Sequence, residues 1–303
     1  MGADWVGTSV ADRQKTILDV IRGARRRLDL SLFRCNDADV LDELRLAAAR
    51  GVQVNVLVTP RAKGKAKKRR KLCDALECAG ASVRVYAQPT VKYHAKYMLA
   101  DEGPAVVASF NLTSKCFERT LDGFVLTYDP DVVAGLRTLI AGDRNARPAP
   151  SSITPRLIVG PERSRRDLTS LIAQARSSIR IIDAKLSDPD LVSLLNRRRA
   201  EGLTVEVFGS KKLAGLKSHG KMLLIDDRIA VIGSLALTPV SLDTRREVAI
   251  VVQEREAVAE VARLFRTIRE SCTLSGFAAT GRSLELPMAA RPSVAAPRQE
   301  VLC

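Results

Sequence analysis

The sequence has few histidines and few aromatic residues, and its cysteines are scattered. Two histidines and six cysteines occur in 303 residues, and no two cysteines form a Cys-x2-Cys pair. This pattern argues against a structural zinc site, and we interpret the cysteines as the reduced thiols of a cytoplasmic protein. Aromatic residues make up 4% of the chain, which gives little support to a stacking platform for single-stranded nucleic acid.

Long apolar runs are also missing. No run approaches the roughly 18–20 residues that a membrane-spanning helix needs. The first residues lack the basic start and apolar stretch of a secretory signal. We therefore expect a cytoplasmic protein. The alternative is a cytoplasmic protein that attaches peripherally to a membrane. The composition, 46% hydrophobic and 27% charged, is that of a soluble globular protein.

Positive charge dominates the chain. It carries 49 Lys and Arg against 34 Asp and Glu, a net charge of +15. Such a surface predicts an anionic partner, which is nucleic acid, an anionic phospholipid surface or a phosphorylated small molecule. The densest run is RAKGKAKKRRK at residues 61–71, with eight basic residues in eleven. It indicates either a docking segment for one of these partners or a solvated loop with no specific partner.

The chain is an internal duplication. Residues 17–58 align with 168–209, and each copy indicates a helix, an apolar strand, a helix opened by Asp, a Gly stop and a second strand. Further along, residues 92–113 align with 217–238, so the first copy holds an insertion, predicted as a basic loop, a helix and a strand. We predict an α/β fold of two similar halves, each a mixed β-sheet flanked by helices, packed as a pseudo-two-fold pair.

A proline-containing segment separates the two copies. Three prolines in residues 143–156 interrupt regular structure. We therefore predict an N-terminal half over residues 1–142, a linker over 143–156 and a C-terminal half over 157–274. The remaining residues, 275–303, are rich in Ala and Pro and are predicted to be a loosely ordered tail.

The only two histidines, His94 and His219, occupy equivalent positions in the repeat. Each is followed by a lysine after two residues and by an aspartate after seven, which gives Lys96, Asp101, Lys221 and Asp226. All six are candidate catalytic residues. On an extended strand, residues two apart point to the same face, so each His–Lys pair projects together. The aspartates have the opposite parity, and we interpret them as turn or supporting carboxylates.

Two imidazoles and two ammonium groups suit displacement at a phosphodiester. One neutral histidine attacks phosphorus and the other, protonated, passes a proton to the leaving oxygen, with roles reversed when water or an alcohol resolves the phosphohistidine. The lysines offset the phosphoryl charge, so we expect no metal ion and no cofactor. Neither copy supplies both base and acid. The two half-sites must therefore face each other, and a monomer suffices for a complete active site.

Polar residues follow both motifs at equal distances. Ser109 and Ser234 come fifteen residues after their histidines, and Asp122 and Glu247 thirteen residues after those serines. The hydroxyls, with the amide of Asn111, are candidates to bind phosphoryl oxygens. The two carboxylates are candidates to orient and charge-stabilise a histidine; the alternative is ordinary surface carboxylates.

These motifs resemble the duplicated phospholipase D superfamily, whose signature is His-Lys-Asp followed by Gly-Ser-x-Asn and then an acidic residue. The resemblance covers most of residues 15–270. It implies two phospholipase D-like halves that share one active site, with His94 as the nucleophile and His219 as the general acid. The residues that it implies for phosphate binding are Lys96, Lys221, Ser109, Asn111 and Ser234.

The sequence departs from that signature at three positions. Ala108 replaces the first Gly, Ala236 replaces the second Asn, and Asp122 is one methylene shorter than the usual Glu. The missing second amide removes one phosphate or supporting contact. A non-catalytic binding protein is therefore a further alternative.

The substrate class follows from a second resemblance. The segment IGSLALTPVSLDTRREVAIVV, residues 232–252, is similar to the C-terminal half of cardiolipin synthases and related phosphatidyltransferases. It implies hydrolysis or transfer of a phosphatidyl group at a membrane surface, where each well-placed Lys or Arg adds about 1 kcal/mol of attraction to anionic lipid. The alternative is a metal-independent nuclease of the same superfamily acting on DNA or RNA, with the basic run holding the backbone.

Overall fold

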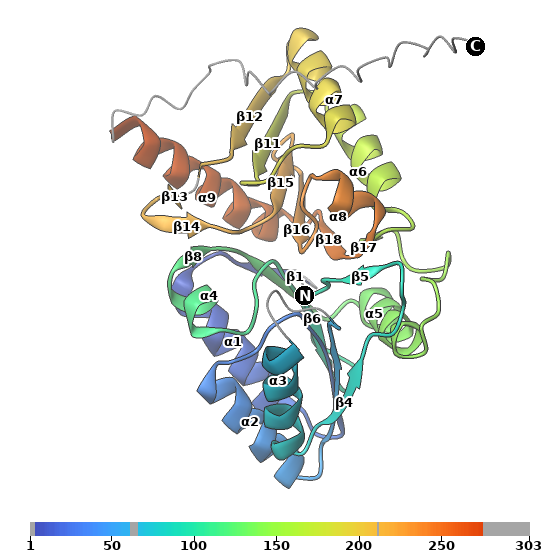
Figure 1. The fold of residues 1–303 in the computed structure, drawn as a ribbon. Coiled ribbons are helices and arrows are strands. Elements are labelled where there is room, and N and C mark those ends of the chain that lie inside the picture. Colours follow the sequence, from blue (N-terminus) through green and yellow to red (C-terminus); the bar gives the residue numbers. More distant parts are fainter. Residues whose placement is uncertain (1–3, 61–65, 211, 275–303) are drawn as a thin grey trace, which may run out of the picture.

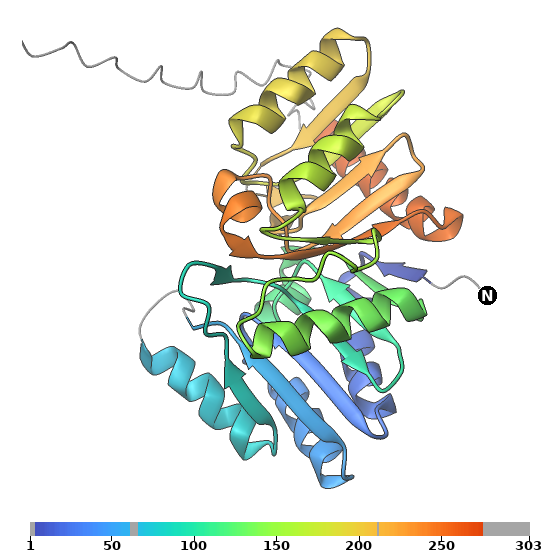
Figure 2. The same cartoon turned by 90° about the vertical axis from the view of Figure 1, so that its right-hand side faces the viewer.

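Each half of the chain is built around one β-sheet, and the two halves are stacked with the N-terminal half below the C-terminal half (Figures 1 and 2). The computed structural model describes residues 4–60, 66–210 and 212–274. The strands of the first sheet are β1 Asp4–Gly7, β2 Arg27–Leu32, β3 Gln53–Val58, β4 Ser82–Val85, β6 Tyr97–Ala100, β7 Ala105–Ala108 and β9 Phe124–Thr127. Those of the second are β10 Leu157–Val159, β11 Ser178–Ile182, β12 Thr204–Phe208, β15 Met222–Ile225, β16 Ile229–Gly233 and β18 Val248–Val252.

The second sheet repeats the first strand for strand. The first has the order β1-β9-β7-β6-β2-β3-β4 and the second the order β10-β18-β16-β15-β11-β12. β2 is parallel to β3 and antiparallel to β6, as β11 is to β12 and β15. The extra strand, β4, follows helix α3 (Ala66–Cys78), and both lie in the predicted insertion. The predicted α/β fold of two similar halves is confirmed.

Helices pack on both faces of each sheet (Figure 1), and two of them, Pro130–Arg144 and Arg255–Leu274, lie on the side that faces the other half. Besides α3, the helices are α1 Val10–Gly23, α2 Ala38–Ala49, α4 Ser114–Glu118, α5 Pro130–Arg144, α6 Ser164–Ala173, α7 Pro189–Ala200, α8 Pro239–Asp243 and α9 Arg255–Leu274. Asp37 and Asp188 begin α2 and α7 in the same way, because each side chain accepts a hydrogen bond from the amide three residues on. No helix in the described ranges has the length and apolar composition that crossing a membrane requires.

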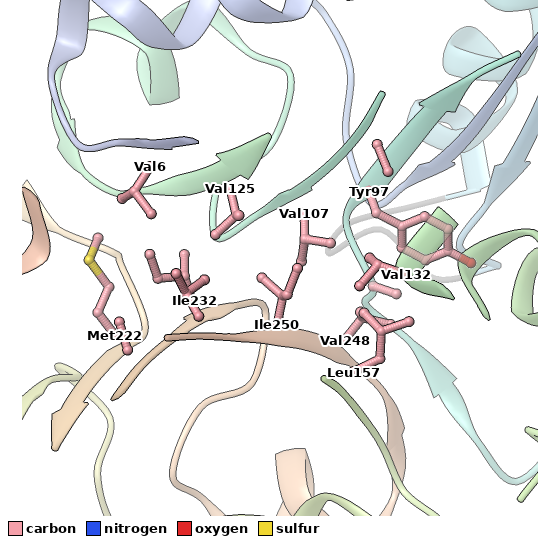
Figure 3. Close-up of a cluster of buried hydrophobic side chains, with 14 of the residues drawn as sticks. Val6, Tyr97, Val107, Val125, Val132, Leu157, Met222, Ile232, Val248 and Ile250 are labelled. Atoms are coloured by element: carbon pink, nitrogen blue, oxygen red, sulfur yellow. The ribbon is translucent and has the colours of Figure 1, made fainter. Parts of the chain in front are cut away.

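An apolar layer joins the two halves. Val107 and Val125 of the first sheet face Ile232 and Ile250 of the second (Figure 3), and all four are buried in one hydrophobic cluster that spans both halves. Burying side chains of this size contributes about 1.5–3 kcal/mol each. The layer therefore holds the halves in a fixed relation, which a site shared between them requires.

The remaining short strands lie outside the two large sheets. They are β5 Lys92–Tyr93, β8 Thr120–Leu121, β13 Lys212–Leu213, β14 Leu216–Ser218 and β17 Arg245–Arg246. β8 of the first half adds to the β13–β14 hairpin of the second, and β17 of the second half pairs with β5 of the first. The predicted tail, residues 275–303, lies outside the described residues, as do residues 61–65 of the basic run.

Candidate active site

Two pairs of short strands, each with one strand from either half, lie at the boundary between the halves (Figure 1). They bring the motif histidines to the carboxylates. β5 is parallel to β17 with Tyr93 opposite Arg246, and β14 is parallel to β8 with Ser218 opposite Leu121. In each pair one strand ends just before a histidine and the other just before a carboxylate. Because the paired strands run in the same direction, the residues that follow them come together.

Each histidine is held by the carboxylate of the other half. His94 Nδ1 lies 2.8 Å from Glu247 Oε2, and His219 Nδ1 lies 2.9 Å from Asp122 Oδ1. Both carboxylates are fully buried. The structure thus brings the two half-sites into one site, and it places Asp122 and Glu247 where a carboxylate orients an imidazole. Nothing in the sequence indicated that each histidine pairs with the carboxylate of the other half.

The environment of His94 favours a neutral imidazole. Burial lowers its pKa to about 4, with Lys96 acting in the same direction and Glu247 against it. Burial alone would raise the pKa of Glu247, but His94 and Lys96 lower it to about 2. An anionic Glu247 accepts a hydrogen bond from the Nδ1–H of a neutral His94, which leaves the lone pair on Nε2.

The second pair is more open. The His219 side chain is 27% exposed, against 17% for His94. Burial and Lys221 lower the pKa of His219, and Asp122 opposes them. Burial alone would raise the pKa of Asp122, but His219 and Lys221 lower it below its usual range. The two pairs have the same geometry and different access to solvent.

Both motif lysines are buried beside their histidines. Lys96 Nζ donates to the His94 carbonyl at 2.8 Å and lies 3.2 Å from His94 Nε2, and Lys221 Nζ donates to the His219 carbonyl. Burial lowers the pKa of Lys96 to about 7. Two ammonium groups in a poorly hydrated site are stabilised by an anion, so the arrangement suits a phosphoryl group.

The strand predicted through each His-x-Lys is interrupted. Residues 94–96 and 219–221 have no regular secondary structure, because the chain passes here from the inter-half pair to its own sheet. Lys96 Nζ still lies 3.2 Å from both ring nitrogens of His94, and Lys221 is near enough to the His219 ring to lower its pKa. The prediction of a shared face is correct, and the prediction of a continuous strand is wrong.

The two motif aspartates lie away from this site. Asp101 follows β6 and accepts hydrogen bonds from the amides of residues 25–27, and Asp226 follows β15 and accepts from residues 176–178. A rise of about 3.3 Å per residue puts Asp101 on the order of 15 Å from Lys96. Their inclusion among the candidate catalytic residues is therefore corrected: both stabilise turns, at positive φ of 43° and 55°.

The serines are placed differently from what phosphate binding needs. Ser109 is fully buried, donates to Asp122 Oδ1 at 2.6 Å and accepts from the Gly123 amide. Ser234, also fully buried, bonds to the carbonyl and the amide of Val248. Ser109 therefore supports a carboxylate and Ser234 supports the backbone next to one. Asn111 stays a phosphate-binding candidate, because its side chain, whose amide NH2 can donate to a phosphoryl oxygen, lines a crevice with Lys96.

Three further residues shape the site without having been predicted. Thr120 donates to Asp122 Oδ2 at 2.6 Å, and Ser241 donates to Glu247 Oε1 at 2.9 Å. The Phe33 ring lies edge-on to His94, 4.6 Å between centroids. Ser241 could have been found from the repeat alignment, because it lies six residues before Glu247, as Cys116 does before Asp122. Nothing in the sequence singles out Phe33 or Thr120.

The duplicated fold with a cross-paired two-histidine site defines a protein of the phospholipase D type. The model of the family described as "Cardiolipin synthase, PLD-like domain" matches residues 17–143 and 211–269, which is more than half of the chain. The chain belongs to this family. The predicted family resemblance is confirmed.

Similar proteins carry related names. Cardiolipin synthase A of Pseudomonas putida (strain W619) is 30% identical over 156 residues, which are 48% of this chain and 33% of that protein. Cardiolipin synthase A of Pseudomonas aeruginosa (strain LESB58) is 29% identical over 143 residues, 46% of this chain and 29% of that protein. The matched part thus spans about a third of the length of these curated relatives.

Solved structures show the same fold at low identity. Phosphatidylserine synthase of Haemophilus influenzae superposes with a TM-score of 0.71 at 14% identity, over 88% of this chain and 86% of that chain. Polyphosphate kinase of Porphyromonas gingivalis gives 0.70 at 17% identity, over 87% of this chain and 50% of that chain. At these identities the likeness concerns the fold alone.

Proposed function

We propose that this protein is a phosphatidyltransferase or phospholipase D-type phosphodiesterase that acts on phospholipid through a phosphohistidine on His94. The observation that carries the proposal is the reciprocal pairing of His94 with Glu247 and of His219 with Asp122. It supplies two oriented imidazoles, each backed by a buried carboxylate, beside two buried lysines. This is the set of groups that a two-step displacement at phosphorus uses.

In the first step, His94 Nε2 attacks phosphorus and the bond from phosphorus to the leaving alkoxide breaks. His219 donates a proton to that oxygen, and Glu247 stabilises the positive charge that forms on His94. Lys96, Lys221 and the Asn111 amide bind the non-bridging oxygens. In the second step, His219 takes a proton from water or an acceptor alcohol, whose oxygen attacks phosphorus and releases His94.

The assignment of the nucleophile follows from burial. His94 is the more buried histidine, and its pKa of about 4 keeps it neutral near pH 7. His219 is more exposed, which suits the histidine that exchanges protons with departing and entering alcohols. The structure therefore supports His94 as nucleophile on physical grounds that are independent of the family resemblance.

Phospholipid is the substrate class that we favour, because the matched family is described as a cardiolipin synthase domain and the net charge is +15. A basic surface attracts anionic lipid, so we propose peripheral binding to an anionic membrane. A phosphodiesterase acting on nucleic acid is the second candidate, favoured by the basic run of residues 61–71.

One assay decides between these substrates. The purified protein is mixed with phosphatidylglycerol vesicles, and in parallel with single- and double-stranded DNA, with a chelator present throughout. We expect release of glycerol or formation of a transfer product from the lipid, and none in a His94→Asn variant. Cleavage of DNA with inert lipid would replace the lipid proposal by the nuclease. An absolute requirement for a divalent metal would contradict the two-histidine mechanism.

A further inference from the structure

A thiol lies beside the second histidine–carboxylate pair. Cys116 is a buried residue of α4. Its Sγ, a carboxylate oxygen of Asp122 and a ring nitrogen of His219 all lie within 4.8 Å of one another. Within the described ranges, this is the one group of three or more His, Cys, Asp or Glu side chains close enough to share an ion.

Beside the first histidine–carboxylate pair, His94 and Glu247, a hydroxyl stands at the position equivalent to Cys116. Ser241 lies six residues before Glu247 and three after the capping Thr238, as Cys116 does relative to Asp122 and Thr113. The Ser241 hydroxyl donates to Glu247. At this position the two halves differ by one atom, oxygen in Ser241 and sulfur in Cys116.

We infer that Cys116, Asp122 and His219 form a binding site for a soft divalent cation, Zn²⁺ or Cd²⁺, and that its occupation inhibits the enzyme. Thiolate sulfur, imidazole nitrogen and carboxylate oxygen are ligands that zinc takes at about 2.0–2.3 Å. Ligands at those distances in a tetrahedral site lie roughly 3.5 Å apart. The three donors therefore need only a small approach to hold an ion.

Binding removes the groups that proton transfer uses. The thiol of Cys116 loses its proton to solvent. The ion takes the place of the proton between His219 Nδ1 and Asp122, and solvent returns that proton to Nε2 of the same ring. His219 is then held as a metal ligand and no longer exchanges a proton with the alcohol. The inhibition rests on the proposed function, whereas the binding does not.

The thiolate makes the site selective among divalent ions. The buried guanidinium of Arg13 donates to the carbonyls of Cys116 and Asp122, and Lys96 is close enough for Cys116 to affect its pKa. These cations repel a divalent ion, and the thiolate with Asp122 offsets them. A thiophilic ion gains the sulfur bond, whereas Mg²⁺, which prefers oxygen ligands, does not. The His219 side chain, 27% exposed, gives an ion access to the site.

Cadmium titration of the full chain tests the site. The readout is the ultraviolet absorbance of the cadmium–thiolate bond, compared among wild type, Cys116→Ser and Cys78→Ser. Serine at position 116 copies Ser241 and removes the sulfur, and Cys78 is an exposed cysteine on α3. We expect Cys116→Ser to lose the tightest step and to bind at least about tenfold more weakly. Cys78→Ser should keep it.

The same variants are then assayed on lipid. We expect Cd²⁺ and Zn²⁺ to inhibit wild type and Cys78→Ser, excess chelator to restore their activity, Mg²⁺ to have no effect, and Cys116→Ser to be active and resistant. Cys116→Ala serves as a second variant if serine impairs folding, which circular dichroism reports.

Two results would overturn the inference: equal tight cadmium absorbance in wild type and Cys116→Ser, or inhibition that is unchanged in Cys116→Ser. If wild type is inert on lipid while the absorbance still depends on Cys116, the metal site stands and the proposed function fails.

Discussion

His94 and Glu247, 153 residues apart in the chain, are joined by a hydrogen bond of 2.8 Å across the boundary between the two halves. The pair exists because β5 and β17 run parallel with Tyr93 opposite Arg246. The backbone amide of His94 continues this pairing by donating to the carbonyl of Arg246. A residue inserted in either short strand would therefore separate the imidazole from its carboxylate without removing either group.

The two histidines should give different defects. His94→Asn removes the nucleophile, so no covalent intermediate forms. His219→Asn leaves the nucleophile and removes the proton donor and acceptor, which contributes about 10²–10⁴-fold. With a substrate whose leaving group needs no proton, such as a p-nitrophenyl phosphodiester, His219→Asn should accumulate an acid-labile phosphoprotein, detected as a mass increase. Accumulation in His94→Asn instead would reverse the assignment of roles.

The carboxylate of Glu247 should matter for rate rather than for fold. Glu247→Gln keeps the size of the side chain and removes the charge that stabilises the His94 cation, so kcat should fall by about 10²–10⁴-fold. The matched control is Glu256→Gln, an exposed position on α9, which should leave kcat unchanged. Thermal unfolding of both variants separates a rate effect from loss of structure. Wild-type kcat in Glu247→Gln would contradict the pairing argument.

Both limbs of the pH profile of kcat/KM should lie at lower pH than the ordinary pKa values of His and Lys would give. Because attack needs neutral His94, kcat/KM should fall only as pH drops through about 4, where that imidazole takes up a proton. Because phosphate binding needs charged Lys96, kcat/KM should also fall as pH rises through about 7, where the buried ammonium loses its proton. Initial rates from pH 3.5 to 9 on a p-nitrophenyl phosphodiester, whose leaving group needs no proton from His219, measure both limbs. An acidic limb at about 6.5, the ordinary pKa of His, would show that burial does not control His94.

The turn aspartates should affect stability and not catalysis. Asp101 accepts hydrogen bonds from the amides of Arg25, Arg26 and Arg27, which outweigh burial and lower its pKa. Asp101→Ala removes these bonds and places a less suitable residue at positive φ. We expect a loss of about 2 kcal/mol in the free energy of unfolding, measured by urea denaturation, with kcat of the folded protein unchanged. A large fall in kcat with no loss of stability would instead support a catalytic role for Asp101.

Substitutions of Asn111 and Ser109, both predicted from the sequence to bind phosphate, should have different kinetic effects. Asn111→Ala should raise KM and lower kcat, because the amide lies in the crevice with Lys96. Ser109→Ala should act through Asp122, whose carboxylate it holds at 2.6 Å, and therefore mainly lower kcat. Steady-state kinetics on one phosphodiester compares the two. A KM effect for Ser109→Ala as large as that for Asn111→Ala would place this hydroxyl at the phosphate.

The sequence was sufficient for the duplication, the α/β class and the motif residues. Helix and strand periodicity are local properties, and equal spacing of His, Lys, Ser and an acidic residue in two copies is visible without coordinates. It was not sufficient for the local path of the chain at the motif, since residues 94–96 and 219–221 are irregular. There, pairing with the opposite half competes with continuation of the strand, and a single sequence does not reveal that competition.

The sequence by itself determined which groups are available: two histidines, two lysines and two carboxylates in a common register. Only the tertiary structure decided their partners, exchanging Asp122 and Glu247 between halves, turning Ser109 and Ser234 inward and setting Cys116 beside His219. The physical reason is that the contacts of the two histidines join residues about a hundred or more positions apart. They depend on how two sheets pack through a shared apolar layer and on the register of two short strand pairs, and neither is encoded in any local pattern.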